Sequence, residues 1–593
     1  MIWSKASNSD RFAEGAVTLE QEPAPALLKP AVSSAKSPPH SFRLVVVVLA
    51  LLTFASIFIR IGFIENRPYA GRLDGQEPES HILTTLMAME QSPIATHKFL
   101  PIVSLGARYN KFIDEHPGAG AADEEGNYFY TSTPPLTFAM PYLAHKLTGV
   151  APTMQSLRYY NLMLQMLATM ALAAFVWLSL RGAADPIARA MATATAAAVY
   201  LTAPECLVSH SINLWGQQFT TVLLMVQIIL FCFRPSLGAL FLLAMLGCLS
   251  DWTPYIANSV MAALALWSWR RNGDGKALLI FFAIGLGCLA GGLALIAWNG
   301  LVMTPEQYFH ALAVRQADRT VQGWSYIYDF IPSYTQSLGV FGLLLFWQPW
   351  RLFRWRDAES KAAECSAGSR VILPDLHPLV IGVIIVACAL IENLLMADHA
   401  LRYSYDRLKG VQLLALALAL GASHSGAVAR RFFAGTVAAG VVSMAVFWLS
   451  WTSQIGWHYI AHSQQERIGA VIRATVSNEG PAFFNGDVRA AEVYYAGRNL
   501  FQNVDNAAAE AGVTTDEFVR KWLGAHQFEQ GVVYEISGSY PLPKKRDLPR
   551  TLSVRRVHAD GRVEQLGSHT LDEKVEDYHG GSVIYMMDPI LRD

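Results

Sequence analysis

Arg72–His81 (RLDGQEPESH) and Tyr130–Leu136 (YTSTPPL) mark the two ends of a long segment between the first and second apolar runs of this chain. Connections longer than about 15 residues in compact proteins are usually functional or disordered. This segment, residues 65–156, carries apolar side chains throughout, which favours function over disorder. Its acids Asp74 and Glu77 follow directly after the first apolar run, and they therefore suggest chemistry at a membrane surface.

The composition is that of a membrane protein. Of the 593 residues, 52% are hydrophobic and 16% are charged, whereas a soluble domain usually carries about 25% charged residues. The net charge of -1 argues against a general affinity for nucleic acid. The six cysteines show neither a metal-binding spacing nor a disulfide framework, so we interpret them as small hydrophobic residues.

The apolar runs predict the membrane spans. Residues 1–42, rich in Pro, Ala and Ser, are interpreted as a disordered cytoplasmic tail. The uncharged run Leu44–Ile59 predicts an uncleaved first membrane helix, with Arg60 reaching the lipid headgroups. Ten further runs bring the predicted number of spans to eleven. They are 157–180, 187–208, 217–233, 236–250, 254–269, 277–299, 331–350, 372–397, 408–422 and 432–453.

Basic residues predict the orientation of these spans. Arg189, Arg234, Arg271 and Arg430 fall on one side of the predicted helices, which the positive-inside bias assigns to the cytoplasm. The N-terminus is then cytoplasmic, and eleven crossings place the C-terminal part outside. The outer segments contain no Asn-x-Ser/Thr acceptor, which favours a bacterial inner membrane over the secretory pathway.

The C-terminal part, residues 456–593, predicts a small soluble α+β domain. Strands are expected at 482–484 and 532–536 and a helix at 515–527, while Asp560-Gly561 predicts a hairpin between 552–558 and 563–566. The predicted fold is therefore a polytopic α-helical membrane domain over 43–455, which includes the outer loop 65–156, followed by a periplasmic domain.

Asp74 and Glu77 are the first candidate site. Apolar residues at helical spacing predict an amphipathic helix over Ser80–Glu90 at the membrane interface, with the two acids just before its start. Such acids stabilise a helix N-terminus through its dipole, so a capping role accounts for them. An acid here equally suits proton removal from a hydroxyl, or the binding of a divalent cation.

The segment Asp398–Lys409 is the second candidate. Its cations include Arg402 and Arg407, and with His399 they suit a bound phosphate, because guanidinium groups match phosphate oxygens. Arg, Lys and Tyr also anchor helices at headgroup level, which is the competing interpretation. The basic residues here oppose the positive-inside bias, which favours function.

Further outer residues have weaker signals. Lys98 and Arg158 are cations that are commonly solvated or ion-paired. His210 and Trp215 suit either a sugar pocket or helix-end packing. The order Asp-Trp-Thr-Pro predicts Asp251 as the N-cap of a helix that begins at Pro254.

These elements, by their order along the chain and their common position on the outer side of the membrane, resemble those of the GT-C superfamily of integral-membrane glycosyltransferases. The likeness is to bacterial relatives of protein O-mannosyltransferases and lipid A aminoarabinose transferases. Four features carry it: the acids after the first helix, the element Tyr130–Leu136 with its Pro134-Pro135 pair, Arg158-x-x-Asn161 at the second span, and His399-x-x-Arg402-Tyr403. Relatives often have adjacent Asp-Glu, whereas Gly75-Gln76 separates the acids here, which puts metal binding in doubt.

The resemblance implies transfer of a sugar from a polyprenyl-phosphate donor to an acceptor hydroxyl on a protein, lipid or polysaccharide, with inversion. Asp74 would be the general base, with Glu77 beside it. Lys98, His399, Arg402, Tyr403 and Arg407 would bind the donor phosphate. Tyr130, Pro134, Pro135, Arg158, His210 and Trp215 would line the pocket. No cofactor is implied with certainty, and a divalent cation remains open.

Two other classes of function stay open. A transporter or lipid flippase would show inverted repeats and ionisable residues at mid-membrane. The chain has no evident repeat, and Glu392 is its main mid-membrane candidate. An envelope acyl or phosphoryl transferase would also require outer acids and cations.

Overall fold

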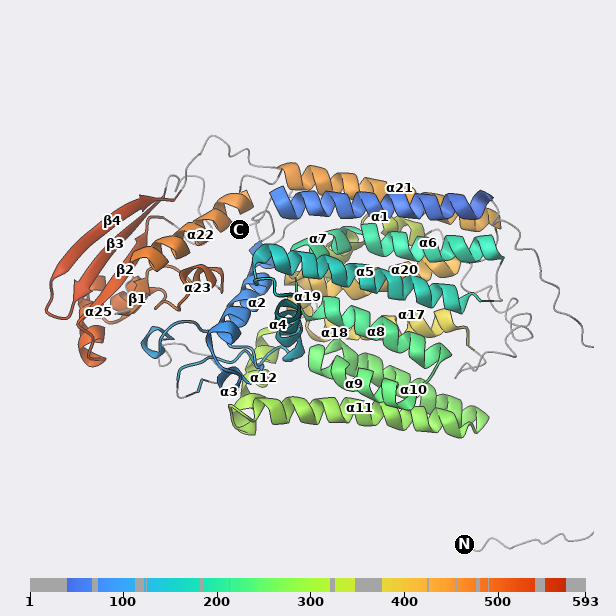
Figure 1. Ribbon diagram of the computed structural model, residues 1–593, viewed down its shortest axis with the longest axis horizontal. Helices are drawn as coiled ribbons and strands as arrows, with labels where there is room; N and C mark the ends of the chain where they lie inside the picture. Colours follow the sequence, from blue (N-terminus) through green and yellow to red (C-terminus); the bar gives the residue numbers. More distant parts are fainter. Residues whose placement is uncertain are drawn as a thin grey trace, which may run out of the picture.

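The protein is a helical bundle with a small sheet domain at one end, as a computed structural model shows (Figure 1). The structure describes residues 40–66, 73–111, 122–123, 125–181, 185–212, 214–319, 326–346, 376–423, 426–453, 457–475, 480–488, 490–538 and 550–571.

The bundle contains a helix in each apolar run that the sequence indicates. Within the described residues, six helices are long and apolar enough to cross a membrane, or seven if the bent pair α6–α7 forms one span. The expected count of eleven crossings therefore stays a prediction, because several helices are short. The bundle helices are α1 (His40–Asn66), α5 (Met154–Ser179), α6 (Pro186–Thr202), α7 (Pro204–Ile212), α8 (Gly216–Phe233), α9 (Leu237–Ser250), α10 (Thr253–Asn272), α11 (Gly275–Asn299), α13 (Tyr326–Leu338), α14 (Val340–Phe346), α17 (Pro378–Ala389), α18 (Ile391–Leu395), α20 (Leu408–Ala422) and α21 (Gly426–Ser453).

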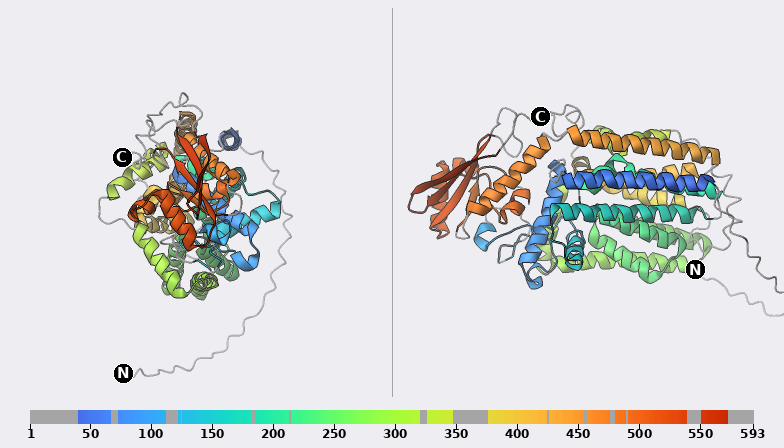
Figure 2. Two further views of the ribbon diagram at one scale, coloured as in Figure 1. Left: turned by 90° about the vertical axis from the view of Figure 1, so that its left-hand side faces the viewer. Right: turned by 45° about the horizontal axis from the view of Figure 1, so that its top comes forward.

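From α5 to α11 the long helices alternate in direction, and most of the connections between them are short and lie at the two ends of the bundle (Figures 1 and 2). Local signals set their ends: Asp185 accepts a hydrogen bond from Ile187 N ahead of Pro186, and Thr153 and Ser156 form a capping box before α5. The alternation places one set of basic residues at the end opposite the sheet domain. They are Arg181, Arg189, Arg234, Arg271 and Arg430.

The α6–α7 pair bends by 53° at Ala203, and side chains from two other helices stabilise the break. Pro204 has no N–H, so the carbonyl of Tyr200 accepts a hydrogen bond from Gln165 Nε2 at 3.0 Å instead. The carbonyl of Leu201 accepts from Arg60 Nη2 at 2.7 Å. The prediction that Arg60 reaches the headgroups is therefore wrong: its side chain is fully buried, because the negative end of α6 attracts it.

Small residues bring α9 and α11 into close contact. A Cβ atom on Gly291 would lie 2.8 Å from Cys248 Cβ, so this position requires glycine. The Sγ atoms of Cys248 and Cys288 lie 3.5 Å apart across the same contact. α9 has 14 residues and α11 has 25, so α9 ends well before the end of its neighbour. Its last residues therefore lie inside the bundle.

The segment between α1 and α5 folds across the end of the bundle (Figure 1). Its elements are α2 (Leu73–Gln91), α3 (Ile94–His97), η1 (Arg108–Lys111) and α4 (Leu136–Thr148). α2 begins at Leu73, seven residues before the predicted start at Ser80, so Asp74 and Glu77 lie on its first turns and not before it. The prediction followed the apolar spacing, which begins only after Ser80, whereas the helix extends back through Pro78.

The apolar side of α2 contacts protein and not lipid. Ile82, Leu83 and Leu86 are fully buried. The helix packs against α4, α5 and α7 on the bundle, and against α23 (Ala490–Ala496) of the C-terminal domain. Thr84 Oγ1 donates a hydrogen bond to the carbonyl of Ala490 at 3.3 Å. The expected insertion of this apolar side into the membrane interface is therefore wrong, whereas the position of the helix at that interface stays a prediction.

The C-terminal part has the expected strands and helices. The sheet order is β1-β2-β3-β4, in which β1 and β2 are parallel and the other pairs are antiparallel. Gly561 takes φ 96° in the turn between β3 and β4, as the Asp-Gly hairpin signal predicts. The elements are α22 (Trp457–Thr475), β1 (Ala482–Phe484), α24 (Val504–Glu510), α25 (Thr515–Ala525), β2 (Gln530–Ile536), β3 (Thr551–His558) and β4 (Val563–Thr570).

Candidate functional site

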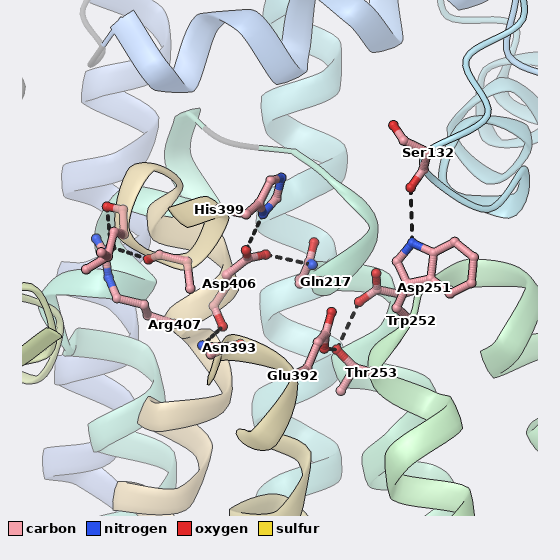
Figure 3. A network of polar contacts seen from close by, with 12 residues as sticks. Ser132, Gln217, Asp251, Trp252, Thr253, Glu392, Asn393, His399, Asp406 and Arg407 are labelled. Carbon is pink, nitrogen blue, oxygen red and sulfur yellow. Dashed lines mark hydrogen bonds and ion pairs between the residues drawn. The ribbon is translucent and has the colours of Figure 1, made fainter. Parts of the chain in front are cut away.

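Polar and aromatic side chains gather where several helices end beneath α2 and α4. The contributing elements are the N-terminal ends of α8, α10 and α20, the C-terminal end of α9, and the short helices α18, α19 (Ala397–Arg402) and η4 (Ser404–Arg407). Figure 3 shows the core of this cluster, which we call the end-of-bundle network.

A row of aromatic rings crosses the site from the first long loop to α19. Tyr130 meets Trp215 with ring centroids 6.0 Å apart, and Trp215 stacks on Tyr405 at 6.2 Å. Tyr405 stacks on Tyr403 at 5.4 Å, and Tyr403 contacts His399 at 4.5 Å. Four predicted site residues, Tyr130, Trp215, Tyr403 and His399, therefore lie in one row, and Tyr405 links them.

The element Tyr130–Leu136 is fixed to the α9–α10 connection. Trp252 Nε1 donates a hydrogen bond to the carbonyl of Ser132 at 3.0 Å. Thr137 Oγ1 donates to the carbonyl of Ser250 at 2.8 Å. Pro134 and Pro135 are buried and lead into α4, with Pro135 at its N-cap. A proline pair suits this position, because the first turn of a helix leaves its N–H groups without partners.

Asp406 is the centre of a second set of contacts. Its Oδ1 accepts a hydrogen bond from Gln217 Nε2 at 2.8 Å, and its Oδ2 lies against His399 Nδ1 (Figure 3). Its backbone carbonyl accepts from Asn393 Nδ2 at 2.9 Å. Asn393 Nδ2 also donates to the hydroxyl of Tyr334 at 2.5 Å. The side chain is 5% exposed; residues of α8 and α19 hold its carboxylate, and α18 holds its backbone.

Lys409, Glu392 and Asp251 form a third group beside it. Lys409 Nζ lies 3.0 Å from Glu392 Oε2 and 3.2 Å from Thr253 Oγ1. Thr253 Oγ1 donates to Asp251 Oδ2 at 3.1 Å and also contacts Glu392. Burial, reinforced by the nearby carboxylate of Glu392, raises the pKa of Asp251 to about 8. The group thus holds two acids and one base, and burial disfavours the ionised form of Asp251.

The predicted capping role of Asp251 is wrong. The N-cap of α10 is Trp252, and Asp251 lies one residue earlier, at the C-cap of α9. Its extended backbone turns the side chain toward Thr253 and the buried cluster (Figure 3). The Asp-Trp-Thr-Pro pattern therefore does not mark a cap here.

Arg407 is held by protein groups on several sides. Its Nε donates to Ser337 Oγ at 2.7 Å and lies 3.5 Å from Glu205 Oε2. Its Nη1 donates to the carbonyl of Ala400 at 2.8 Å. The side chain is 4% exposed, so these contacts fix the turn between α19 and α20 to the bent helix α7.

Arg158 is likewise ion-paired. Its Nη2 lies 3.1 Å from Glu79 Oε2, and the two side chains are 1% and 0% exposed. The pair joins α2 to the start of α5. Burial raises the pKa of Glu79 to about 7, although the charge of Arg158 opposes this shift. Of the two interpretations given for this cation, ion pairing is the one that the geometry supports.

The remaining predicted residues are not part of the row of rings. Lys98 is the C-cap of α3, and its Nζ donates to the carbonyl of Leu301 at 2.8 Å, at the end of α11. His210 is fully buried and contacts Tyr200 OH and Asn161 Oδ1, as helix packing predicts. Asp74 and Glu77 are placed by backbone on α2, and Arg402 on α19. Their side chains lie outside the described residues.

The sequence predicted no site role for Asp251, Tyr405 or Asp406, whereas Gln217 was expected, with His210 and Trp215, either to line a sugar pocket or to pack at a helix end. Gln217 and Asp406 are 189 residues apart, so spacing along the chain gave no signal. An available signal was the number of acids and amides close to the ends of apolar runs, where burial is expected. Among the residues that the structure describes, no group of three His, Cys, Asp or Glu is arranged to hold a metal ion.

Comparison with known proteins gives a limited result. No protein-family model matches the chain, and no curated protein matches its sequence. Two crystal structures of ArnT from Cupriavidus metallidurans, in the apo state and bound to undecaprenyl phosphate, are similar in structure. Their TM-scores are 0.42 and 0.43, at 13% and 14% identity, and each match covers 83% of this chain and 92% of the other. At these values the likeness transfers no residue role to this chain.

Proposed function

We propose that this protein is a membrane glycosyltransferase that moves a sugar from a polyprenyl-phosphate donor to an acceptor hydroxyl at the outer face. The observation that carries the proposal is the row from Tyr130 to His399. It joins the first long loop, the start of α8 and α19 at one end of the bundle, beside a buried set of acids and cations. The ArnT structure bound to undecaprenyl phosphate shows a ligand of the proposed class in a protein of similar chain path.

The proposed reaction is a single displacement with inversion. Asp74 is the proposed general base, because α2 lies across the end of the bundle and carries this acid on its first turn. It removes the proton of the acceptor hydroxyl as the hydroxyl oxygen bonds to the anomeric carbon. The bond from that carbon to the phosphate oxygen breaks on the opposite face. Glu77, one turn later on the same helix, is the second candidate acid.

The leaving phosphate requires positive charge or hydrogen-bond donors nearby. Arg402 follows His399 by three residues on α19, which places the two positions on one side of the helix. We therefore propose Arg402, His399 and the hydroxyl of Tyr403 as the phosphate contacts, with Lys98 as a further cation. Arg407 and Arg158 already contact Glu205 and Glu79, so we assign them the task of holding α19, α20 and α2 in place.

The aromatic rings suit a sugar substrate, because ligand pockets combine aromatic walls with a few fixed polar groups. Arg315 of α12 (Pro305–Arg319) lies over the ring of Tyr130 at 5.9 Å and adds a cation to the loop side of the row. The orientation assigned by the basic residues places this end of the bundle outside the cytoplasm.

Mass spectrometry of envelope glycans, with and without the protein, tests the proposal. We expect one glycan modification to disappear on deletion and to return with the wild-type chain. A chain that carries Asp74→Asn should insert in the membrane but should not restore the modification. Identical glycans in all strains, together with substrate flux into vesicles without a covalent product, would assign the protein to transport.

A further inference from the structure

We infer that Asp406 is a positioning residue for His399, and that it aims Nε2 of the imidazole at the leaving phosphate as a proton donor. The inference rests on the proposed function and deepens it, because it assigns the group that neutralises the departing lipid phosphate. Asp406 itself touches no substrate in this account.

The first observation is the immobility of the carboxylate. Oδ1 of Asp406 is held by Gln217, Oδ2 contacts His399, and the backbone carbonyl is held by Asn393. Gln217 of α8 thus fixes one carboxylate oxygen, and Asn393 of α18 fixes the backbone of the same residue. With both held, the carboxylate sets the orientation of the imidazole that contacts it. A buried carboxylate also requires a compensating partner, which the His399 ring supplies.

The second observation is the orientation of the ring. Nδ1 of His399 faces Asp406, and the second ring nitrogen lies on the far side of the ring, away from the acid (Figure 3). The ring contacts Tyr403 at 4.5 Å and Tyr405 at 6.0 Å, which limits its rotation. The His399 side chain is 11% exposed, whereas Asp406 is 5% exposed. The histidine thus has one nitrogen that contacts Asp406, and the second nitrogen points away from this contact.

The third step is the chemistry. In the charged imidazole both nitrogens carry a proton, and Asp406 balances the charge. As the bond between the anomeric carbon and the phosphate oxygen breaks, the electron pair stays on that oxygen. Nε2 transfers its proton to a phosphate oxygen, and the lipid phosphate leaves as a monoanion. His399 becomes neutral, Nδ1 keeps its proton toward Asp406, and the carboxylate is not protonated at any stage.

A double-mutant cycle tests the inference. We expect Asp406→Asn to lower kcat for sugar transfer by about 10²-fold, at the low end of the range for proton-transfer assistance, with a smaller effect on the donor KM. His399→Gln should show a similar loss. In the His399→Gln background, Asp406→Asn should cost less than about threefold, because residues that act as one unit are not additive. Equal losses in both backgrounds would overturn the inference.

Asp398→Asn is the matched control, because it removes a carboxylate that neighbours His399 on α19. It should retain the wild-type rate, and a loss equal to that of Asp406→Asn would show that local charge, not the contact, is responsible. Thermal unfolding of each solubilised variant separates misfolding from a catalytic effect.

A spectroscopic readout tests the pairing apart from the proposed function. Nitrogen-15 histidine labelling, with His399→Gln to assign the signal, reports which ring nitrogen carries the proton. We expect Asp406→Asn to change the His399 signals, and unchanged signals would overturn the inference. A wild-type protein without transfer activity but with this spectral change would contradict the proposed function and leave the pairing in place.

Discussion

Arg158 and Glu79 form a fully buried ion pair, with Nη2 and Oε2 3.1 Å apart, and it joins the first long loop to the bundle. Glu79 follows Asp74 on α2 by five residues, so the pair fixes the helix that carries the proposed base. The position of α2 therefore depends on the charge of Arg158 at the start of α5.

The ion pair makes a prediction for stability. Arg158→Ala leaves Glu79 buried without its partner, which should lower the free energy of unfolding by about 3–5 kcal/mol. The double variant Arg158→Met with Glu79→Gln removes both charges and should recover most of this loss. Denaturant unfolding in detergent measures both. A loss below about 1 kcal/mol in Arg158→Ala, as for an exposed pair, would contradict the buried geometry.

The raised pKa of Glu79 makes a prediction for pH. Burial lifts it from 4.5 to about 7, so the folded state holds a proton that the unfolded state has already released in this window. Because the folded state binds more protons, the free energy of unfolding should fall as pH rises from 4.5 to about 7. The Glu79→Gln variant lacks this pH dependence. The free energy of unfolding of the wild-type protein, relative to that of the variant, should therefore fall as the pH rises. A relative gain for wild type over this window would show that the pKa is lowered instead.

Asp251 makes a prediction for donor binding. Its pKa of about 8 means that the carboxyl is neutral below this pH and ionised above it. Ionisation adds a negative charge close to Glu392, which disfavours an anionic phosphate donor. The donor KM should therefore rise by several-fold as pH passes about 8 in wild type. Asp251→Asn should show a flatter profile, and an unchanged rise in this variant would exclude Asp251 as the cause.

Asp74→Asn should lower the transfer rate by about 10²–10⁴-fold, the usual contribution of a general base. Membrane insertion and the unfolding temperature should not change. Asp185→Asn is the control, since it removes the cap of α6 at the opposite end of the bundle. Full activity of Asp74→Asn would remove the proposed base, and a comparable loss in Asp185→Asn would indicate a general effect of lost charge.

Arg402→Ala should raise the KM for the sugar donor and weaken binding of the free lipid phosphate, because the substitution removes a positively charged group that can hydrogen-bond to the phosphate. Arg271→Ala serves as the matched control, since this arginine lies over Trp267 at the last turn of α10, at the far end of the bundle. Binding is measured with short-chain polyprenyl phosphate in detergent. An unchanged response to donor concentration in Arg402→Ala would exclude a phosphate contact there.

The sequence predicted the helices and strands well, because long apolar runs and turn signals are local. The Asp560-Gly561 hairpin and the helix from Thr515 needed only neighbouring residues. The helix over Ser80–Glu90 was predicted, but its start at Leu73 was not, because the apolar spacing begins later. Its packing against α4, α5 and α23 involves residues distant in the sequence. The burial of Arg60 was not predicted either, because its partner, the carbonyl of Leu201, lies 141 residues away in the sequence.

The candidate site was predicted in part. Motif order identified Tyr130 and His399, and its place in an outer loop made Trp215 a pocket candidate. The structure brings the three residues into one row. It could not reveal that Tyr405 links them, or that Asp406 holds His399 while Gln217 holds Asp406. Those contacts depend on the way in which short helices end inside the bundle, and no pattern of spacing along the chain encodes them.

Sugar transfer in a reconstituted system tests the central claim most directly. The purified protein in vesicles receives a polyprenyl-phosphate sugar, labelled in the sugar, together with an extract of envelope acceptors. We predict a labelled covalent product and release of one lipid phosphate for each sugar transferred, both lost in Asp74→Asn. Movement of the labelled lipid across the vesicle membrane with no covalent product and no released lipid phosphate would contradict the account.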